Sequence, residues 1–233
     1  FLDTCRKINL NPSASHNLEA LRMLLSTGSV LSPDCFDYVY QYVKEEICLS
    51  SISGGTDIVS CFVLGSTILP VCRGELQTRG LGLSVEVWNE LGESVTGEKG
   101  ELVCTSTFPS KPIMFWNDKN MDKYKSSYFE RYSNVWCHGD YVKLMESGGM
   151  IFYGRSDATL NRDGVRIGTA EIYRQVEILT EVLESVVVEQ ALDDDSRIIL
   201  FVKLSEGQQL NDGLKNKIAR QIRSNTTPRH VPD

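Results

Sequence analysis

The side chains best suited to chemistry gather between residues 139 and 172, where acidic and basic residues alternate with glycines. Asp140 and Asp157 offer carboxylates, which only accept hydrogen bonds and can take two hydroxyl protons at once. Arg166 offers a guanidinium, which binds phosphoryl oxygens bidentately. The chain has a formal net charge of −7 and its basic residues are scattered. A polyanionic ligand would therefore have to be bound by a few specifically positioned Lys or Arg side chains.

The order of these residues resembles the signature of the adenylate-forming superfamily, which includes acyl-CoA synthetases, peptide-synthetase adenylation domains and luciferases. In that signature a Gly-Arg-x-Asp precedes a Gly-x-Arg and a Glu-Ile. Here Gly154-Arg155-Ser156-Asp157 is followed by Gly164-Val165-Arg166 and by Glu171-Ile172. A match at five positions with fixed spacing favours the family, and the alternative is a solvated hairpin with charges at its rim.

A second motif lies upstream, where Trp136-Cys137-His138-Gly139-Asp140 resembles the family's Thr-Gly-Asp, whose aspartate hydrogen-bonds the ribose hydroxyls of ATP. Gly-Asp alone would be an ordinary turn, but Asp140 lies 14 residues before Gly154, which makes the assignment credible. The resemblance predicts that Asp140 and Arg155 anchor the ribose. His138 stands where many relatives have threonine, and we expect it to neighbour the ribose aspartate instead of binding a metal.

A third motif, Gly54-Gly55-Thr56-Asp57, resembles the family's Gly-x-Thr-Glu loop, with aspartate in place of glutamate. In the family the hydroxyl contacts the α-phosphate and the acid helps to hold magnesium, a hard cation that prefers oxygen ligands. The resemblance therefore predicts catalytic roles for Thr56 and Asp57, with Asp57 as the Mg²⁺ ligand. Ser53, Gly54 and Gly55 are predicted to contact the nucleotide, and a plain glycine turn is the alternative.

Two further segments are carried over from the same resemblance. Gly28, Ser29 and Val30 align with a short loop that packs on adenine in acetyl-CoA synthetases, although two of its three matching positions differ here. Gly164 is predicted to face the channel for the pantetheine arm of coenzyme A, because a Cβ would narrow that path. The alternative is that Gly164 only turns the chain at Asp163-Gly164, a common hairpin dipeptide.

Across almost the whole chain the resemblance is strongest to the acetoacetyl-CoA synthetases. It implies that acetoacetate attacks the α-phosphorus of Mg-ATP to give acetoacetyl-adenylate and pyrophosphate, after which the thiol of coenzyme A displaces AMP. Arg166 is then the expected cation for the phosphates, with an ordinary surface arginine as the alternative. Alignment on Thr56 places Gly54 where acetyl-CoA synthetases have a tryptophan, which predicts room for a longer acid. The stretches that carry this resemblance are Ser51–Asp57, Phe115–Asp118, Trp136–Tyr141, Gly154–Asp157 and Arg229–Pro232.

The elements that must position these residues follow from the apolar periodicity. Alternation and turn residues predict a β-rich block up to the second hairpin, and the order hairpin, helix, strand, strand, helix after residue 157 predicts a small α+β domain. The predicted fold is therefore α/β and α+β. Residues 1–156 would form the distal part of the AMP-binding domain, and residues 157–233 most of a mobile C-terminal domain with its hinge near Asp157. The predicted helices are 17–26, 33–47, 170–183 and 211–224, and the predicted strands are 83–88, 101–104, 141–144, 150–153, 186–188 and 198–204.

Composition excludes several other classes of protein. Scattered basic residues argue against nucleic-acid and membrane-surface partners, and no apolar run approaches the roughly 20 residues that span a bilayer. The seven cysteines are irregularly spaced without a Cys-x-x-Cys pair, so we expect reduced, mostly buried thiols and a cytosolic location.

Both ends of the sequence bear on activity. The chain begins at Phe1 without a methionine and ends at Asp233 directly after Val231-Pro232, so we expect cuts through a longer protein. The phosphate loop would precede Phe1 and the catalytic lysine would follow Asp233, which predicts little adenylation activity for these residues alone. The alternatives are a synthetase for another short acid and a non-catalytic relative that binds nucleotide or a partner protein. A plain interaction module does not explain Asp140, Arg155, Asp157 and Arg166 together.

Overall fold

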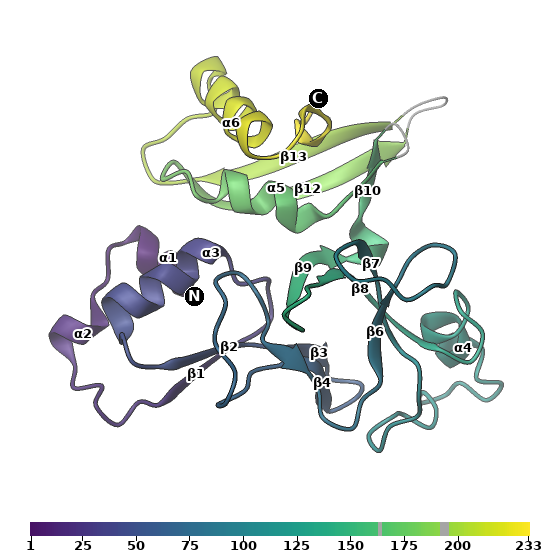
Figure 1. The fold of residues 1–233 in the computed structure, drawn as a ribbon. Helices are drawn as coiled ribbons and strands as arrows, with labels where there is room; N and C mark the ends of the chain where they lie inside the picture. The colour runs from purple at the N-terminus through teal and green to yellow at the C-terminus, as the bar shows by residue number, and fades with distance from the viewer. Residues whose placement is uncertain (163–164, 192–195) are drawn as a thin grey trace. The chain divides into compact units, whose positions relative to one another are not determined.

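The computed structural model describes residues 1–162, 165–191 and 196–233, and it divides into two compact units. The first unit contains residues 1–152 and the second contains residues 153–233. Strand β9 (Met150–Arg155) runs across this boundary. The first unit has two apolar clusters and the second has one, and the two units are described separately below. Figure 1 traces the elements of both.

The first unit opens with a parallel pair of strands, β1 (Met23–Ser26) and β2 (Cys48–Ser51), in which Ser26 lies opposite Ser51. Helices join and accompany this pair, and α1 and α3 lie beside it in Figure 1. Their apolar side chains form one core with Leu49, Phe36 and Val39. The helical elements are α1 (Leu2–Lys7), α2 (Pro12–Ser15), α3 (Pro33–Tyr38) and the π-helix η1 (Val39–Val43).

The helix predicted at residues 17–26 was wrong, because its second half is strand β1 and its first half is a turn. The Nζ atom of Lys44 donates to the carbonyl oxygens of Leu18, Glu19 and Leu21 at 3.0, 2.8 and 2.7 Å. These carbonyls therefore have partners without helical hydrogen bonds. The hydrogen bonds of β1 to β2 and those of Lys44 to these carbonyls therefore favour strand and turn over the helix that the apolar spacing predicts.

Two antiparallel sheets complete the first unit. One has the order β3-β4-β5, and the other has the order β6-β7-β8-β9, with Trp136 opposite Cys104 and Tyr141 opposite Glu101. Helix α4 (Asp122–Tyr128) packs against β8 and places Tyr124 in the core formed around Phe62 and Trp136. The strands are β3 (Ser53–Gly55), β4 (Ser60–Leu64), β5 (Thr78–Arg79), β6 (Val85–Trp88), β7 (Lys99–Cys104) and β8 (Trp136–Leu144).

The second unit is a small α+β domain in which two helices cover one face of a long hairpin. Val182, Val187 and Ile198 point from the hairpin into a core that also contains side chains of both helices. Alternate residues of the same strands, among them Val186 and Phe201, remain exposed on the other face. Its elements are η2 (Ser156–Ala158), β10 (Leu160–Arg162), β11 (Val165–Ile167), α5 (Thr169–Val176), β12 (Val182–Ala191), β13 (Ser196–Leu204), α6 (Asp212–Asn225) and η3 (Pro228–His230).

Capping side chains fix where these two helices begin. The Glu171 carboxylate accepts the backbone N–H of Gly168 at 3.0 Å before α5, and Asn211 accepts the N–H of Leu214 at 2.9 Å at the start of α6. Helix α5 ends at Val176 instead of residue 183, because Val182 already belongs to strand β12. The order hairpin, helix, strand, strand, helix that was predicted for this unit is confirmed, as is the mixed α/β fold class. In the first unit, the helix predicted at 33–47 ends at Val43.

The cysteines are all free thiols, as predicted. Cys5, Cys35, Cys104 and Cys137 are buried, and the other three are partly buried. Within the described part of the chain, no helix is long and apolar enough to cross a membrane.

Candidate functional site

Two of the predicted segments leave the same edge of the parallel strand pair. The loop with Gly28 follows β1, and the segment from Ser53 to Asp57 follows β2. The backbone N–H of Ile52 donates to the carbonyl of Ser26 at 2.9 Å, which keeps the two exits side by side. Ligands of open α/β sheets bind outside the carboxyl ends of parallel strands. The fold therefore places both segments where a nucleotide site is expected.

Gly28 has a φ of +88° and no atom near its Cβ position, so its role is conformational. Val30, two residues later, packs against the core that contains Phe62. The loop is thus fixed to the rest of the first unit by an apolar contact, while its glycine permits the left-handed turn.

Asp140 joins this edge from strand β8. Its Oδ2 atom accepts a hydrogen bond from the Ser53 hydroxyl at 3.1 Å, and the Nε2 atom of His138 lies 3.8 Å from the same oxygen. The His138 ring in turn packs edge-on against Phe62, with 4.7 Å between ring centroids. Asp140 and His138 are both buried, so their orientations are fixed by packing as well as by polar contacts. The expectation that His138 neighbours Asp140 is confirmed.

Thr56 and Asp57 are exposed in the turn between β3 and β4. The Tyr128 hydroxyl donates to Oδ2 of Asp57 at 2.5 Å, and the Tyr128 ring is stacked on Trp136 with 3.7 Å between centroids. No group of three potential ligands (His, Cys, Asp or Glu) surrounds a metal position among the residues that the structure describes. An exposed single carboxylate suits Mg²⁺ when phosphate oxygens supply other ligands, because Mg²⁺ is commonly held by one or two carboxylates plus substrate phosphates.

The glycines before this turn are explained by close contacts. A Cβ on Gly55 would lie 1.8 Å from Oδ1 of Asp57 and 3.3 Å from Cε1 of His138. A Cβ on Gly54 would lie 2.1 Å from the carbonyl oxygen of Ser60 and 2.6 Å from the Cα of Cys61, both in strand β4. Residues 53–55 therefore form a short strand pressed against β4, where a ligand-facing loop was predicted. Backbone atoms of β4 therefore occupy the position of a Cβ at residue 54. This steric need for glycine weakens the argument that Gly54 serves only to enlarge a pocket.

In the second unit, Arg166 lies in β11 and holds the turn that follows β9. Its Nη2 atom donates to the carbonyl of Ser156 at 3.1 Å and to the Thr159 hydroxyl at 3.2 Å, and its Nε atom lies 3.3 Å from the same hydroxyl. Arg155 Nε donates to Asp157 Oδ1 at 3.3 Å, with both side chains more than half exposed. An exposed pair of this kind contributes little to stability, so these two residues stay accessible to a ligand. Gly164 lies outside the described residues.

The structure thus gathers the predicted residues into two groups, one in each unit. Sequence reasoning missed Tyr128 and Phe62, whose side chains contact Asp57 and His138. Tyr128 lies 71 residues from Asp57 and belongs to no motif, so only the tertiary structure reveals it. The first group is Gly28, Ser29, Val30, Ser53, Gly54, Gly55, Thr56, Asp57 and Asp140, and the described members of the second are Arg155, Asp157 and Arg166.

Comparison with known proteins gives a consistent result. The chain is 55% identical over 232 residues to the acetoacetyl-coenzyme A synthetase of Rhizobium meliloti (strain 1021), and 47% identical over 234 residues to that of Gallus gallus. Both alignments cover the whole chain but only 36% and 35% of the relatives, so the chain spans about a third of their length. No model of a protein family matches it.

Solved structures agree with these relatives. The acetoacetyl-CoA synthetase from Streptomyces lividans superposes with a TM-score of 0.90 at 43% identity, over 100% of this chain and 35% of that one. An anthranilate CoA ligase in complex with anthranoyl-AMP superposes with a TM-score of 0.78 at 18% identity, over 97% of this chain and 42% of that chain. The second likeness concerns the fold alone.

Proposed function

We propose that this chain, which belongs with the acetoacetyl-CoA synthetases among the adenylate-forming enzymes, forms the ribose and adenine side of an ATP-dependent acid–thiol ligase. In the reaction a carboxylate oxygen of acetoacetate attacks the α-phosphorus of ATP, and pyrophosphate leaves. The thiol sulfur of coenzyme A then attacks the acyl carbon of acetoacetyl-adenylate, loses its proton and displaces AMP. The observation that carries the proposal is the Ser53–Asp140 hydrogen bond at the carboxyl edge of β1 and β2.

Asp140 is the proposed ribose ligand. A largely buried carboxylate can accept both ribose hydroxyl protons, and Ser53 and His138 hold it in one orientation. Gly28, Ser29 and Val30 supply the adenine side from the neighbouring strand exit. By resemblance to the family motif, Arg155 is a second proposed ribose ligand.

The phosphate end is assigned to Thr56, Asp57 and Arg166. The Thr56 hydroxyl would donate to an α-phosphate oxygen, and Arg166 would stabilise the charge that builds at phosphorus during attack. Mg²⁺, when bound to Asp57 and the phosphates, would neutralise phosphate charge. The hydrogen bond from the Tyr128 hydroxyl holds the Asp57 carboxylate in one orientation.

The second unit is proposed to move between the two half-reactions about Asp157, with Gly164 beside the pantetheine path. Such a hinge needs a few residues at the end of an element, and Asp157 lies in the short helix η2 just after β9. The proposed substrates are ATP, acetoacetate and coenzyme A, and the proposed location is the cytosol. The competing functions are ligation of another short acid and nucleotide binding without turnover.

The test replaces Asp140 by asparagine in the full-length protein that contains these residues, and it measures acetoacetate-dependent AMP formation together with nucleotide binding. One carboxylate hydrogen bond to a hydroxyl contributes about 1.5–3 kcal/mol, so the KM for ATP should rise about tenfold or more while the KM for acetoacetate changes little. The matched control is Glu146→Gln, an exposed acid in the turn after β8. An unchanged ATP requirement in a folded Asp140→Asn protein would refute the ribose assignment, and nucleotide binding without any AMP formation would favour the non-catalytic alternative.

A further inference from the structure

A hollow of about 730 Å³ lies on the side of helix α4 and is built from residues outside the site proposed above. Its volume falls within the range of about 300–1,000 Å³ that is usual for small-molecule sites. Helix α4, the residues that flank it and Lys111 from the preceding loop line the hollow.

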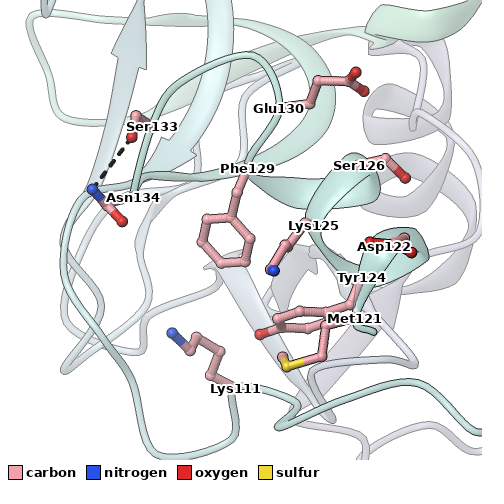
Figure 2. A pocket seen from close by; sticks show the side chains of 10 residues that line it. All are labelled: Lys111, Met121, Asp122, Tyr124, Lys125, Ser126, Phe129, Glu130, Ser133 and Asn134. Carbon is pink, nitrogen blue, oxygen red and sulfur yellow. Dashed lines mark hydrogen bonds between the residues drawn. The ribbon is translucent and has the colours of Figure 1, made fainter. Parts of the chain in front are cut away.

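Two lysines converge on this hollow. Figure 2 shows the ammonium groups of Lys111 and Lys125 directed toward the Phe129 ring, while the carboxylates of Asp122 and Glu130 lie at the margin and point elsewhere. Lys111 Nζ lies 5.4 Å from the centroid of that ring. Among the residues that the structure describes, neither lysine side chain has an ion-pair or hydrogen-bond partner. Two lysines that form no ion pair within the described part of the chain therefore face one space, and the two acidic residues that also line it, Asp122 and Glu130, direct their carboxylates elsewhere.

The walls of the hollow are aromatic and fixed. Phe129 packs on Tyr124, with 5.6 Å between centroids, and on Trp136 at 5.9 Å. Met121, which also lines the hollow, has a φ of +60°, a left-handed conformation that is costly for a residue other than glycine. Such conformations persist where the surrounding structure over-determines them, and they concentrate at ligand sites.

We propose that this hollow binds a small organic anion, with a phosphate or carboxylate group between Lys111 and Lys125 and a flat apolar body against Phe129. An anionic group at this position would be attracted by both ammonium groups. Lysine binds phosphate as a point charge, so the site needs no fixed fork geometry. The ligand is expected to be partly apolar because its flat body can pack against the aromatic ring of Phe129.

The test is calorimetric titration of the purified protein with phenyl phosphate, inorganic phosphate and benzoate. We expect saturable binding of phenyl phosphate in about the millimolar range, and weaker binding of inorganic phosphate, which lacks the apolar body. Benzoate distinguishes the two anionic groups, because equal binding of benzoate would assign the site to carboxylates as well as phosphates.

Variants then locate the binding. The double change Lys111→Gln and Lys125→Gln should weaken phenyl phosphate about tenfold or more, because it removes both charge-assisted contacts. Lys123→Gln is the matched control, since Lys123 is exposed on the same helix but does not line the hollow. A thermal melt checks that each variant is folded, as expected for exchanges of polar side chains at the surface. Absence of saturable binding, or equal affinity in the double variant and the wild type, would overturn the proposal.

Discussion

A substitution at Gly54 distinguishes two explanations for this glycine, namely that it enlarges the acid pocket or that strand β4 leaves no room for a side chain. Resemblance predicts that Gly54 replaces a tryptophan and deepens the acid pocket, so Gly54→Trp should depress acetoacetate use and spare or improve acetate use. The structure places the carbonyl oxygen of Ser60 only 2.1 Å from the position of a Cβ. Because ordinary contacts begin at 3.4 Å, strand β4 must move by more than an ångström to accept even alanine.

The magnitude follows from that displacement. Overpacking against an element that cannot yield costs about 1–3 kcal/mol. One kcal/mol shifts the Tm of a domain of this size by about 2–4 °C, so Gly54→Ala should lower the Tm by roughly 2–12 °C. Ser60→Ala is the local control, because it changes the exposed neighbour on β4 without adding a clash.

The assay uses the full-length protein that contains these residues and combines thermal unfolding with turnover of acetoacetate and acetate. We expect Gly54→Trp to lose both activities together, in proportion to its loss of folded protein. A Gly54→Trp protein with unchanged Tm and a preference for acetate would refute the steric reasoning and restore the pocket explanation. A Gly54→Ala protein as stable as the wild type would refute it as well.

Three further predictions concern the rest of the chain. Burial raises the pKa of the Cys137 thiol to about 12, so this thiol should resist alkylation at pH 8 until the protein is unfolded, as mass spectrometry of labelled peptides would detect. The hydrogen bond from Trp88 holds the pKa of the Glu86 carboxyl below its ordinary value. This contribution to stability is present above the unfolded-state pKa and is lost as the pH falls through the folded-state value. The denaturation midpoint of Glu86→Gln should therefore change less than that of the wild type on acidification below about pH 4. Thr159→Val removes an acceptor of Arg166, which should cost about 1 kcal/mol in chemical denaturation, and no loss would show that the hydroxyl contributes nothing.

The sequence was most informative where local pattern and tertiary packing agree. Alternation predicted the strands around Val85 and Leu102, and turn residues predicted the hairpin of β8 and β9, because one face of each strand is buried in the same core. The helix at residues 17–26 failed because a partner strand and the distant Lys44 satisfy its backbone instead. No local pattern contains that information.

The candidate site divides in the same way. Asp140 and Asp57 could be picked from short motifs, and the structure sets Asp140 beside Ser53 and His138. The contact of Tyr128 with Asp57 depends on the packing of α4 against β8, which brings together segments far apart in the chain. The roles of Arg155, Asp157 and Arg166 toward a nucleotide remain predictions.

The parallel pair of β1 and β2 has a consequence for handling the protein in solution. Parallel sheets are normally covered on both faces and built from several strands, whereas this one has two strands in the described part of the chain. The outer edge of β1 presents backbone groups to which another extended chain can add, and Leu25 on this strand is 62% exposed. Self-association at high concentration should therefore begin at this edge, and a lysine at position 25 would suppress it without disturbing a buried side chain.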